Sequence, residues 1–278
     1  MQKQTYEKHI HDDPDFPFFF HSGMQAPAYC PDLLHWHESI ELLYVLRGTI
    51  RVMCGEAVVT AQAGELVIVP PNALHNIVRA GDEPAVYHCL IIDKSFSDGL
   101  KIYLSDMRFR PSAASPEAGE LFERIAAEMA EKRALYKLSV RSYAAALLVY
   151  LYRECRVAGE EEPPGRGSHK IEMVKTVIEY LRLHFGEDLS IEALCGVVGF
   201  SKYYLCRTFR QITGSTVVDY LNSLRCAHAL QLLSSGEYTV GECAEKCGFR
   251  NLSYFAKVYR RYRGCSPSDE LGKASVAT

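Results

Sequence analysis

The amino-acid sequence predicts an α+β protein of two domains, a β-barrel with appended helices followed by an all-α domain. Short runs rich in Val, Ile, Leu and Tyr, separated by turn residues, fill residues from about 30 to 93 and favour a small barrel or sandwich. Helical periodicity replaces them from Ser115 onward. The expected boundaries are 1–110 for the barrel, 111–156 for a helical segment, 157–168 for a linker and 169–278 for the helical domain.

Length and charge agree with this division. The chain has 278 residues, of which 48% are hydrophobic, which is enough for two cores. Residues 169–278 carry 14 Lys and Arg against 11 Asp and Glu, whereas residues 1–168 carry 17 against 23. The net charge of −3 therefore hides a mildly basic C-terminal part, which suits a nucleic-acid partner, beside an acidic part that suits sensing.

The cysteines and the N-terminus indicate a location. The ten cysteines show no metal-type pairs, since Cys243 and Cys247 are four residues apart within a helical pattern. Single cysteines in apolar segments are typical of small buried side chains in a reducing compartment. The polar N-terminus is followed by no apolar run that could form a signal peptide or a membrane span. We expect a cytoplasmic protein with no membrane partner.

The barrel strands are expected in five runs, with turns at residues such as Gly48, Gly55 and Gly64. The runs are Glu41–Leu46, Ile50–Met53, Ala57–Thr60, Leu66–Val69 and Tyr87–Ile92. The segment Asp15–Phe20 holds four Phe and is too short for a helix of its own. We expect it to be an arm or a first strand that covers one mouth of the barrel.

Two apolar stripes with helical spacing follow the barrel. The first comprises Leu121, Phe122, Ile125 and Met129, and the second comprises Val140, Tyr143, Ala144, Leu147, Leu148 and Leu151. Such stripes predict two helices packed on the barrel. The alternative is that part of their apolar surface meets a second copy of the chain, so we expect a homodimer formed through residues 111–156.

The linker and the start of the second domain are marked by composition. Val157–Ser168 is charged and concentrates Pro and Gly at its end, as flexible linkers do. A new amphipathic helical pattern begins immediately after it, carried by Ile171, Val174, Ile178, Leu181 and Phe185.

A repeat within the last third of the chain carries most of the functional information. The stretch Leu205–Gly214 recurs as Phe255–Gly264 at an offset of fifty, and Gly199-Phe200 recurs as Gly248-Phe249. Each copy predicts a short helix, a tight glycine turn and a second helix. In the first copy Ser190 and Ser201 are the expected N-caps, and Gly199 supplies the turn.

The second helix of each copy has a core face and a basic face. In the first copy the core face comprises Leu205, Phe209 and Ile212, and the basic face comprises Tyr203, Arg207 and Arg210. In the second copy the corresponding residues are Phe255, Tyr259 and Tyr262, and Ser253, Lys257 and Arg260. These faces indicate two helix-turn-helix units that enter successive grooves of double-stranded DNA.

The segment between the copies has the length that this arrangement needs. Thr216–Ser234 is a continuous helical pattern of 19 residues, roughly 28 Å long, which suits two recognition helices about one DNA turn of 34 Å apart. We expect Arg210, Arg225 and the cluster Arg260-Arg261-Arg263 to bind mostly phosphate and to set register rather than sequence.

These residues resemble the AraC/XylS-type transcription regulators over about 95 contiguous residues. The matching stretches are Leu189-Ser190-Ile191-Glu192-Ala193-Leu194, Gly199-Phe200-Ser201, Tyr220-Leu221, Leu224-Arg225, Gly248-Phe249, Ser253-Tyr254-Phe255 and Gly264-Cys265-Ser266-Pro267. The resemblance implies a seven-helix domain that binds direct-repeat sites near promoters. It places base-contacting residues at Tyr203, Cys206, Arg207, Asn251, Ser253 and Lys257.

The full DNA-binding surface that we predict adds neighbouring cations and caps to those positions. It comprises Ser201, Lys202, Tyr203, Cys206, Arg207, Arg210, Arg250, Asn251, Ser253, Lys257, Arg260 and Arg261. Two departures from the family pattern stand out. Cys195 replaces a small Ala in the core, and Asp269-Glu270 replaces an aromatic-basic pair, which weakens one terminal contact with the DNA backbone.

A separate cluster is predicted in the barrel. His35, His37 and Glu41 share odd numbering along an expected strand and so point to one face, and His75 follows the Pro-Pro-Asn turn. The spacing resembles the two cupin motifs, which implies a cupin-type barrel. Three His and one Glu suit Zn, Ni, Mn or Fe with free positions for a ligand. The alternative is a metal-free pocket in which these residues bind the hydroxyl groups of a small molecule, while Trp36 and the Phe16–Phe20 arm supply flat apolar faces for a sugar ring. Trp36 has the opposite parity to the histidines, so an outward direction is the other expectation for it.

These observations predict a transcription regulator without catalytic residues. Its partners would be double-stranded DNA, a small-molecule effector such as a sugar or related metabolite, a second copy of the chain and RNA polymerase. Two alternatives remain open: a metal-dependent cupin enzyme with a DNA-binding appendage, and a constitutive DNA-binding dimer with no effector. The sequence shows no second catalytic constellation, which favours the regulator.

Overall fold

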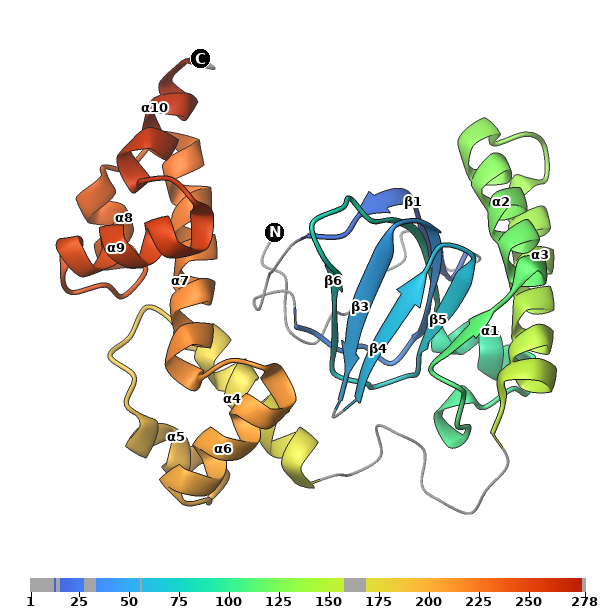
Figure 1. Ribbon diagram of the computed structural model, residues 1–278, viewed down its shortest axis with the longest axis horizontal. Coiled ribbons are helices and arrows are strands. Elements are labelled where there is room, and N and C mark those ends of the chain that lie inside the picture. The colour runs from blue at the N-terminus through green and yellow to red at the C-terminus, as the bar shows by residue number, and fades with distance from the viewer. Residues whose placement is uncertain (1–12, 14–15, 28–33, 56, 158–168, 277–278) are drawn as a thin grey trace. The chain divides into compact units, whose positions relative to one another are not determined.

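The computed structural model describes residues 13, 16–27, 34–55, 57–157 and 169–276. It divides into two compact units, Met1–Ile171 and Glu172–Thr278 (Figure 1). Apart from Val157, the expected linker 157–168 lies outside the described residues, as does the polar N-terminal segment.

The first unit contains two antiparallel sheets, which form the expected barrel. The five-stranded sheet has the order β1-β7-β2-β5-β8 and the three-stranded sheet has the order β4-β3-β6. The strands are β1 (Phe18–Gln25), β2 (Ile40–Arg47), β3 (Thr49–Cys54), β4 (Ala57–Gln62), β5 (Glu65–Val69), β6 (His75–Arg79), β7 (Val86–Ile92) and β8 (Ser112–Ala114). The five predicted runs all became strands, whereas β6 and β8 were not predicted.

Strand β2 is buried on both faces, which explains its nearly continuous apolar sequence. Leu43 and Val45 point into the space between the sheets and join the core that fills the barrel. Leu42 points the other way, into a second core beneath the helices. Glu41 has the parity of Leu43, so its carboxylate enters the barrel interior at one end of the strand.

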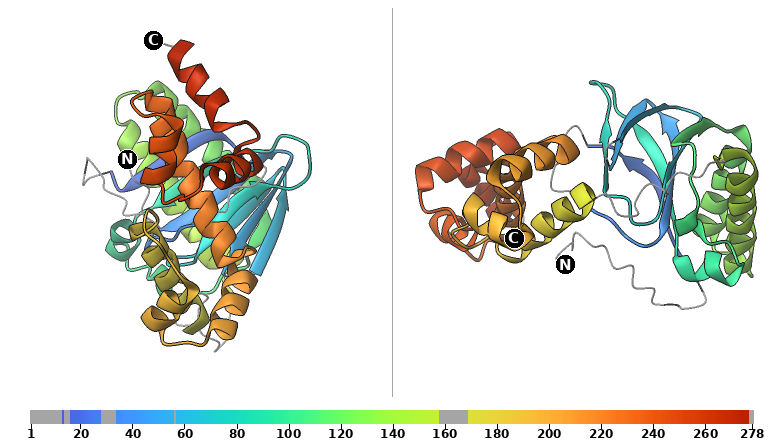
Figure 2. Two further views of the ribbon diagram at one scale, coloured as in Figure 1. Left: turned by 90° about the vertical axis from the view of Figure 1, so that its left-hand side faces the viewer. Right: turned by 90° about the horizontal axis from the view of Figure 1, so that it is seen from below.

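The helices of the first unit cover the outer face of the five-stranded sheet. They are α1 (Lys94–Gly99), α2 (Pro116–Glu131) and α3 (Tyr136–Tyr150), the last continuing as a π-helical turn over Leu151–Cys155. In two views α2 and α3 lie side by side against this sheet (Figures 1 and 2). Phe122, Val140 and Leu147 are fully buried there, so the main stripes of these helices pack on the sheet as predicted.

The Phe-rich segment is a strand rather than a free arm. Phe18 opens β1, which pairs with β7, and its ring contacts Phe96 of α1 at a centroid distance of 4.7 Å. Phe18 is buried, so it belongs to the core between sheet and helices.

The second unit is helical and has the seven helices that the resemblance implied. They are α4 (His169–Leu183), α5 (Ile191–Val198), α6 (Lys202–Thr213), α7 (Val217–Ser235), α8 (Val240–Lys246), α9 (Leu252–Arg263) and α10 (Pro267–Val276). Helices α5 and α6 form the first helix-turn-helix unit, α8 and α9 form the second, and α7 joins them (Figure 1).

Side-chain caps define where these helices begin. Ser190 and Ser201 cap α5 and α6 as predicted, and Thr216 caps α7. Gly199 takes a φ of +71°, which only glycine adopts at little cost. The predicted core residues Leu205, Phe209, Ile212, Phe255 and Tyr259 are all at most 1% exposed.

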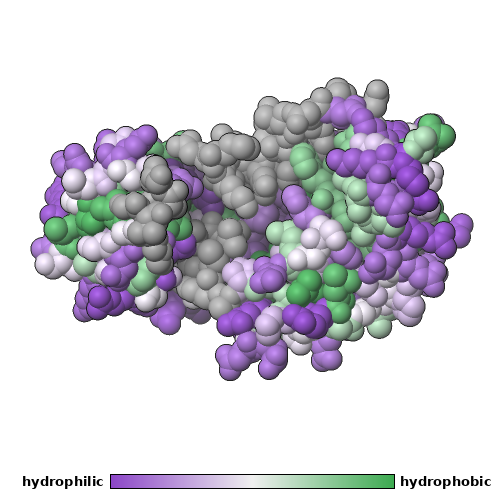
Figure 3. All heavy atoms as spheres, turned by 90° about the horizontal axis from the view of Figure 1, so that it is seen from above, coloured by the Kyte–Doolittle hydropathy of each residue, from purple (hydrophilic) through white to green (hydrophobic). Residues whose placement is uncertain are grey.

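Hydrophilic side chains cover much of the face shown in Figure 3, and the hydrophobic ones gather in separate patches. In the part of the chain that is described, no helix is long and apolar enough to cross a membrane.

Candidate DNA interface and ligand site

The predicted DNA-binding residues of the first helix-turn-helix unit lie on the exposed side of α6. Tyr203 is 73% exposed, Lys202, Arg207 and Arg210 are exposed, and Cys206 is half-buried between them. In the second helix-turn-helix unit the predicted residues lie on the corresponding, exposed side of α9. They are Ser253, Lys257, Arg260 and Arg261. The structure therefore presents an exposed basic face twice, once on each second helix.

A groove of about 870 Å³ runs beside α6. Lys202, Arg207 and Arg210 line it together with Thr216–Val218 at the start of α7. The start of α7 favours an anion in this groove, because the first N–H groups of a helix lack helical partners. Gln211 also lines the groove and was missed by the sequence analysis, although its place next to Arg210 could have suggested it.

Three of the predicted cations form ion pairs on the surface. Lys202 pairs with Glu192 at 2.9 Å, Arg250 with Asp188 at 2.8 Å and Arg261 with Asp219 at 3.4 Å. Exposed pairs of this kind contribute little to stability, so a phosphate can replace the carboxylate at small cost. Among the described residues no ion pair engages Arg207 or Lys257.

Asn251 and Ser201 use their oxygens within the protein. The side chain of Asn251 caps α9 and accepts a hydrogen bond from the Tyr254 amide at 2.8 Å. The Ser201 hydroxyl accepts from the Tyr204 amide at 3.4 Å. For contact with DNA, Asn251 is therefore left mainly with its amide N–H donors.

Arg225, which was expected to bind phosphate, lies against the protein's own backbone. This residue of α7 is half-buried, and its guanidinium donates to the carbonyl oxygens of Phe185 at 2.7 Å and Glu187 at 2.8 Å. Burial lowers the pKa of Arg225 from its usual value. The sequence places Arg225 in a helix, but it does not show that the backbone of Phe185–Glu187 lies against its guanidinium.

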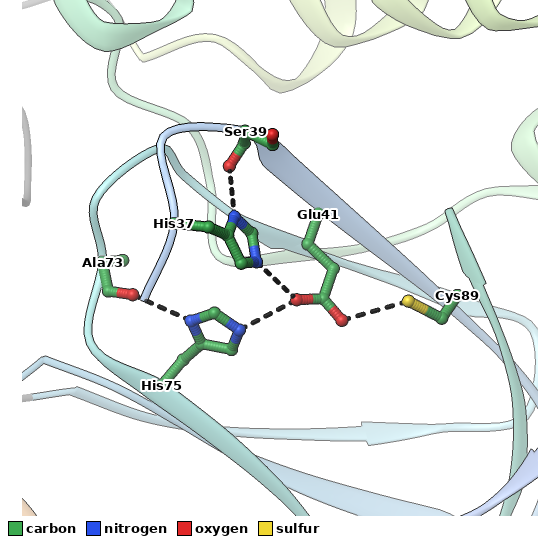
Figure 4. Close-up of polar contacts among 6 residues, drawn as sticks. All are labelled: His37, Ser39, Glu41, Ala73, His75 and Cys89. Atoms are coloured by element: carbon green, nitrogen blue, oxygen red, sulfur yellow. Dashed lines mark hydrogen bonds and ion pairs between the residues drawn. The ribbon is translucent and has the colours of Figure 1, made fainter. Parts of the chain in front are cut away.

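The predicted cluster in the barrel is assembled. Glu41 Oε2 lies 3.2 Å from His37 Nε2 and 2.8 Å from His75 Nε2 (Figure 4). Ligand atoms of His35, His37, Glu41 and His75 all lie within 4.8 Å of one another. The last three are buried and His35 is partly exposed.

Backbone carbonyls orient the two buried imidazoles. His37 Nδ1 lies 2.9 Å from the Ser39 oxygen, and His75 Nδ1 lies 2.8 Å from the Ala73 oxygen (Figure 4). Each ring thus faces an acceptor at both nitrogens, whereas a neutral imidazole carries only one N–H. Two states satisfy this arrangement: a second proton on each ring, or a cation between the Nε2 atoms and Glu41.

The carboxylate itself is held in its charged form. Burial raises the pKa of Glu41, but hydrogen bonds from His37 and His75 and their charge outweigh burial and hold the pKa well below its usual range. The other oxygen, Oε1, accepts a hydrogen bond from the Cys89 thiol at 3.1 Å. Burial, followed by the charge of Glu41, raises the pKa of Cys54 to about 11, so this thiol is neutral.

The route by which the cluster forms differs from the prediction. His35 and His37 do not lie on one strand with Glu41, because residues 38 and 39 form a bend before β2 starts at Ile40. His35 instead pairs through its backbone with His75, which opens β6. The parity of Trp36, opposite to that of the histidines, favoured an outward direction, but the residue is only 6% exposed and therefore buried.

Cys89 was missed as a member of this site. It pairs in register with Leu43, two residues along β2 from Glu41, and its side chain shares the interior face. The alternation along β7 gives its face, but only the pairing register places it beside Glu41.

Comparison with known proteins finds both units. The chain matches the AraC-like ligand binding domain over residues 26–148 and a helix-turn-helix domain over residues 194–272. It is 26% identical to the HTH-type transcriptional activator RhaR of Klebsiella pneumoniae, over 93% of this chain and 96% of that protein. It is 25% identical to the HTH-type transcriptional regulator YdiP of Escherichia coli, over 84% and 79%. A crystal structure of ToxT from Vibrio cholerae aligns with a TM-score of 0.47 at 12% identity, covering 93% of this chain and 99% of that one.

Proposed function

Because the chain belongs to the AraC family of transcription regulators, we propose that it is a cytoplasmic regulator whose DNA binding responds to a small metabolite held at the His-Glu cluster. The observation that supports DNA recognition most directly is the repeated exposed face of α6 and α9. Arg207 and Lys257 occupy the same position on the two helices and are the principal base-contacting residues of this proposal.

DNA selection followed by affinity measurement tests the recognition surface. A site is first selected from randomised duplex DNA with the wild-type protein. Arg207→Ala and Lys257→Ala should each cost roughly 1–3 kcal/mol at that site and relax its sequence preference. Arg261→Ala, the phosphate-type control, should weaken all sequences alike and reduce the salt slope by about one. Unchanged affinity in both recognition-helix variants would remove this assignment.

We further propose that the cluster binds a divalent metal. The metal would be held by Nε2 of His37 and His75 together with Glu41 and His35. This set fits a metal because a backbone carbonyl binds Nδ1–H of each buried ring, which leaves Nε2 as the ligand atom. A bound Zn²⁺, Mn²⁺, Ni²⁺ or Fe²⁺ would offer free positions to oxygen atoms of an effector. The role proposed for the cluster is binding rather than catalysis.

Native mass spectrometry of the protein, purified without chelators, tests the metal. One metal per chain that is lost in His37→Ala would support the metal site and direct the effector search to chelating molecules. A metal-free protein that still binds a metabolite, with the affinity lost in His75→Ala, would identify a hydroxyl-binding pocket instead, and sugars would be screened first.

We propose that two chains associate through the outer surface of α3. Leu138 is 57% exposed, Val149 is 41% exposed and Tyr152, just beyond α3, is 46% exposed. They recur at helical spacing on the side of α3 that does not face the sheet. An apolar stripe left outside the core of a soluble domain is typical of an association surface.

A further inference from the structure

Two side chains of α7 hold the segment that leads into the first helix-turn-helix unit. Arg225 bonds the carbonyls of Phe185 and Glu187, which lie in the loop between α4 and α5. His228, one turn further along α7, stacks on the Phe185 ring at a centroid distance of 4.0 Å and an angle of 8°. The loop continues directly to Ser190, the cap of α5.

The same guanidinium contacts the second unit. It lies over the ring of Phe249 at 5.6 Å, in the turn between α8 and α9. Arg225 therefore contacts the entry loop of one helix-turn-helix unit and the turn of the other. We call Phe185–Glu187, Arg225, His228 and Gly248-Phe249 the inter-unit joint.

The joint is packed closely enough to require glycine at position 248. A Cβ on Gly248 would lie 2.8 Å from the Phe185 oxygen, 2.9 Å from the Gly186 oxygen and 2.9 Å from an Arg225 nitrogen. The backbone φ of Gly248 is also +78°, which disfavours any other residue. Across the same contact, a Cβ on Gly186 would lie 3.2 Å from the Lys246 oxygen.

From this geometry we propose that Arg225 is a positioning residue that fixes the orientation of the two helix-turn-helix units and thereby sets the spacing of the DNA elements they bind. Helix α7 runs through both units, and an exposed ion pair between Arg250 and Asp188 at 2.8 Å also links the loop before α5 to the turn before α9. The buried contacts of Arg225 tie together Phe185 and Phe249, some 60 residues apart, and restrict the relative rotation of the two units. A rigid pair of recognition helices accepts one separation of its half-sites.

This inference rests on the proposed recognition surface, and half-site spacing is the property that tests it. Binding is measured to the selected duplex and to duplexes in which one half-site is moved by one base pair in either direction. The wild-type protein should lose roughly 5- to 150-fold in affinity on such a shift, because it loses at least one base-pair contact. A wild-type protein that selects no DNA sequence would count against the proposed function and not against the joint.

Arg225→Lys is the decisive variant, because it keeps the charge and loses the planar fork. A lysine lacks the planar fork whose Nε and Nη2 bond the two carbonyls separately, and it does not stack on Phe249 in the same way. We expect the shifted and unshifted duplexes to differ by no more than about threefold for this variant, with an unchanged salt slope. Arg261→Lys, a matched control at an exposed position, should keep the wild-type spacing ratio.

Gly248→Ala gives an independent test. It leaves Arg225 in place, and its added Cβ pushes the α8–α9 turn away from the Phe185 and Gly186 carbonyls. It should relax the spacing ratio as Arg225→Lys does, while thermal melting confirms that the helices are folded. A wild-type spacing ratio in folded Arg225→Lys and Gly248→Ala would overturn the proposal. So would an Arg225→Lys protein that weakens all spacings alike with a smaller salt slope, because that result identifies a phosphate contact.

Discussion

Glu41 is the residue on which the barrel site depends, because both of its oxygens are used. Oε2 faces the two buried imidazoles and Oε1 accepts the Cys89 thiol, so the carboxylate plane is fixed. Buried charged groups persist only when they are paired and hydrogen-bonded in this way. The Cys89 thiol is a weak donor, and it supplies the hydrogen bond to Glu41 Oε1, the carboxylate oxygen that does not face the imidazoles.

Loss of the Cys89 donor should weaken metal binding. Cys89→Ala leaves Glu41 Oε1 buried without this hydrogen bond, and the loss of such a supporting contact typically lowers metal affinity about 10- to 100-fold. Cys89→Ser keeps a hydroxyl donor and should recover most of the affinity. Titration with Zn²⁺ or Mn²⁺ against a competing chelator measures both. Equal affinities for the wild-type protein and both variants would show that Cys89 only fills space.

The comparison of Arg207 with Arg225 shows what the sequence can say about single residues. Arg207 lies on α6 within the repeat, Arg225 lies on α7 between the two copies, and both were expected at the DNA. The amphipathic pattern of α6 places Arg207 on the exposed face, and the structure agrees. For Arg225 the deciding fact is the position of the Phe185–Glu187 carbonyls, which comes from folding of the loop and not from the period of α7.

At the scale of elements, the short helix α8 depends on its cap. It has only seven residues, too few to be stable alone. Thr239 accepts from the amide of Glu242, and the Glu242 carboxylate accepts from the amide of Thr239, forming a capping box. Hydrogen bonds from the Thr239 amide and then its hydroxyl lower the pKa of Glu242.

Removal of this cap should destabilise the second helix-turn-helix unit. Thr239→Ala is expected to cost about 1 kcal/mol of unfolding free energy, measured in urea. Thr176→Ala, a control at an exposed mid-helix position of α4, should change it by less than about 0.5 kcal/mol. Because the folded pKa of Glu242 is lowered, its share of the cap is present at neutral pH and is lost as the pH falls through that pKa. A Thr239→Ala effect that grew on acidification would contradict this account.

Helix α3 gives a second prediction at this scale. Val149→Asp places a charge in the exposed apolar stripe and should shift the protein from dimer to monomer in light scattering after size-exclusion chromatography. Val58→Asp, on β4 at 60% exposure, introduces the same charge on another face of the domain and should leave the dimer intact. Dissociation by both variants, or by neither, would rule out α3 as the specific contact.

Elements were predictable where their pattern is local. The strands β2 to β5 and β7 carry apolar runs bounded by turn residues, and α5 to α7 carry both caps and periodicity. Strand β6 has the sequence His75-Asn76-Ile77-Val78-Arg79 and β8 has three residues, so their strand character comes from pairing with β3 and β5. The His-Glu cluster was predicted from motif spacing, but the bend at residues 38 and 39 that brings it together was not.

At the scale of the whole molecule, regulation requires that the barrel site and the DNA surface affect each other. A bound metal or effector shifts DNA binding only if it favours one arrangement of the chain over another. The coupling is then reciprocal, since operator DNA must change metal affinity by the same factor by which the metal changes DNA affinity.

Removal of the metal tests this coupling directly. Typical allosteric factors lie between about 5 and 150, so dialysis against a chelator should change operator affinity by a factor in that range. The affinity for Zn²⁺ or Mn²⁺, measured with and without operator DNA, should change equally. His75→Ala should retain basal DNA binding and lose the response. A metal that binds without any change in DNA affinity would assign the cluster a structural role.

The two second helices of the repeat differ at corresponding positions. Where α6 carries Tyr203, Cys206 and Arg207, α9 carries Ser253, Ala256 and Lys257. One chain that holds two different contact surfaces in a fixed order has no twofold axis, so its DNA site has a head and a tail. Inverting that site beside a gene turns the protein end for end along the duplex. The sequence difference between α6 and α9 therefore gives the bound protein a direction as well as a location.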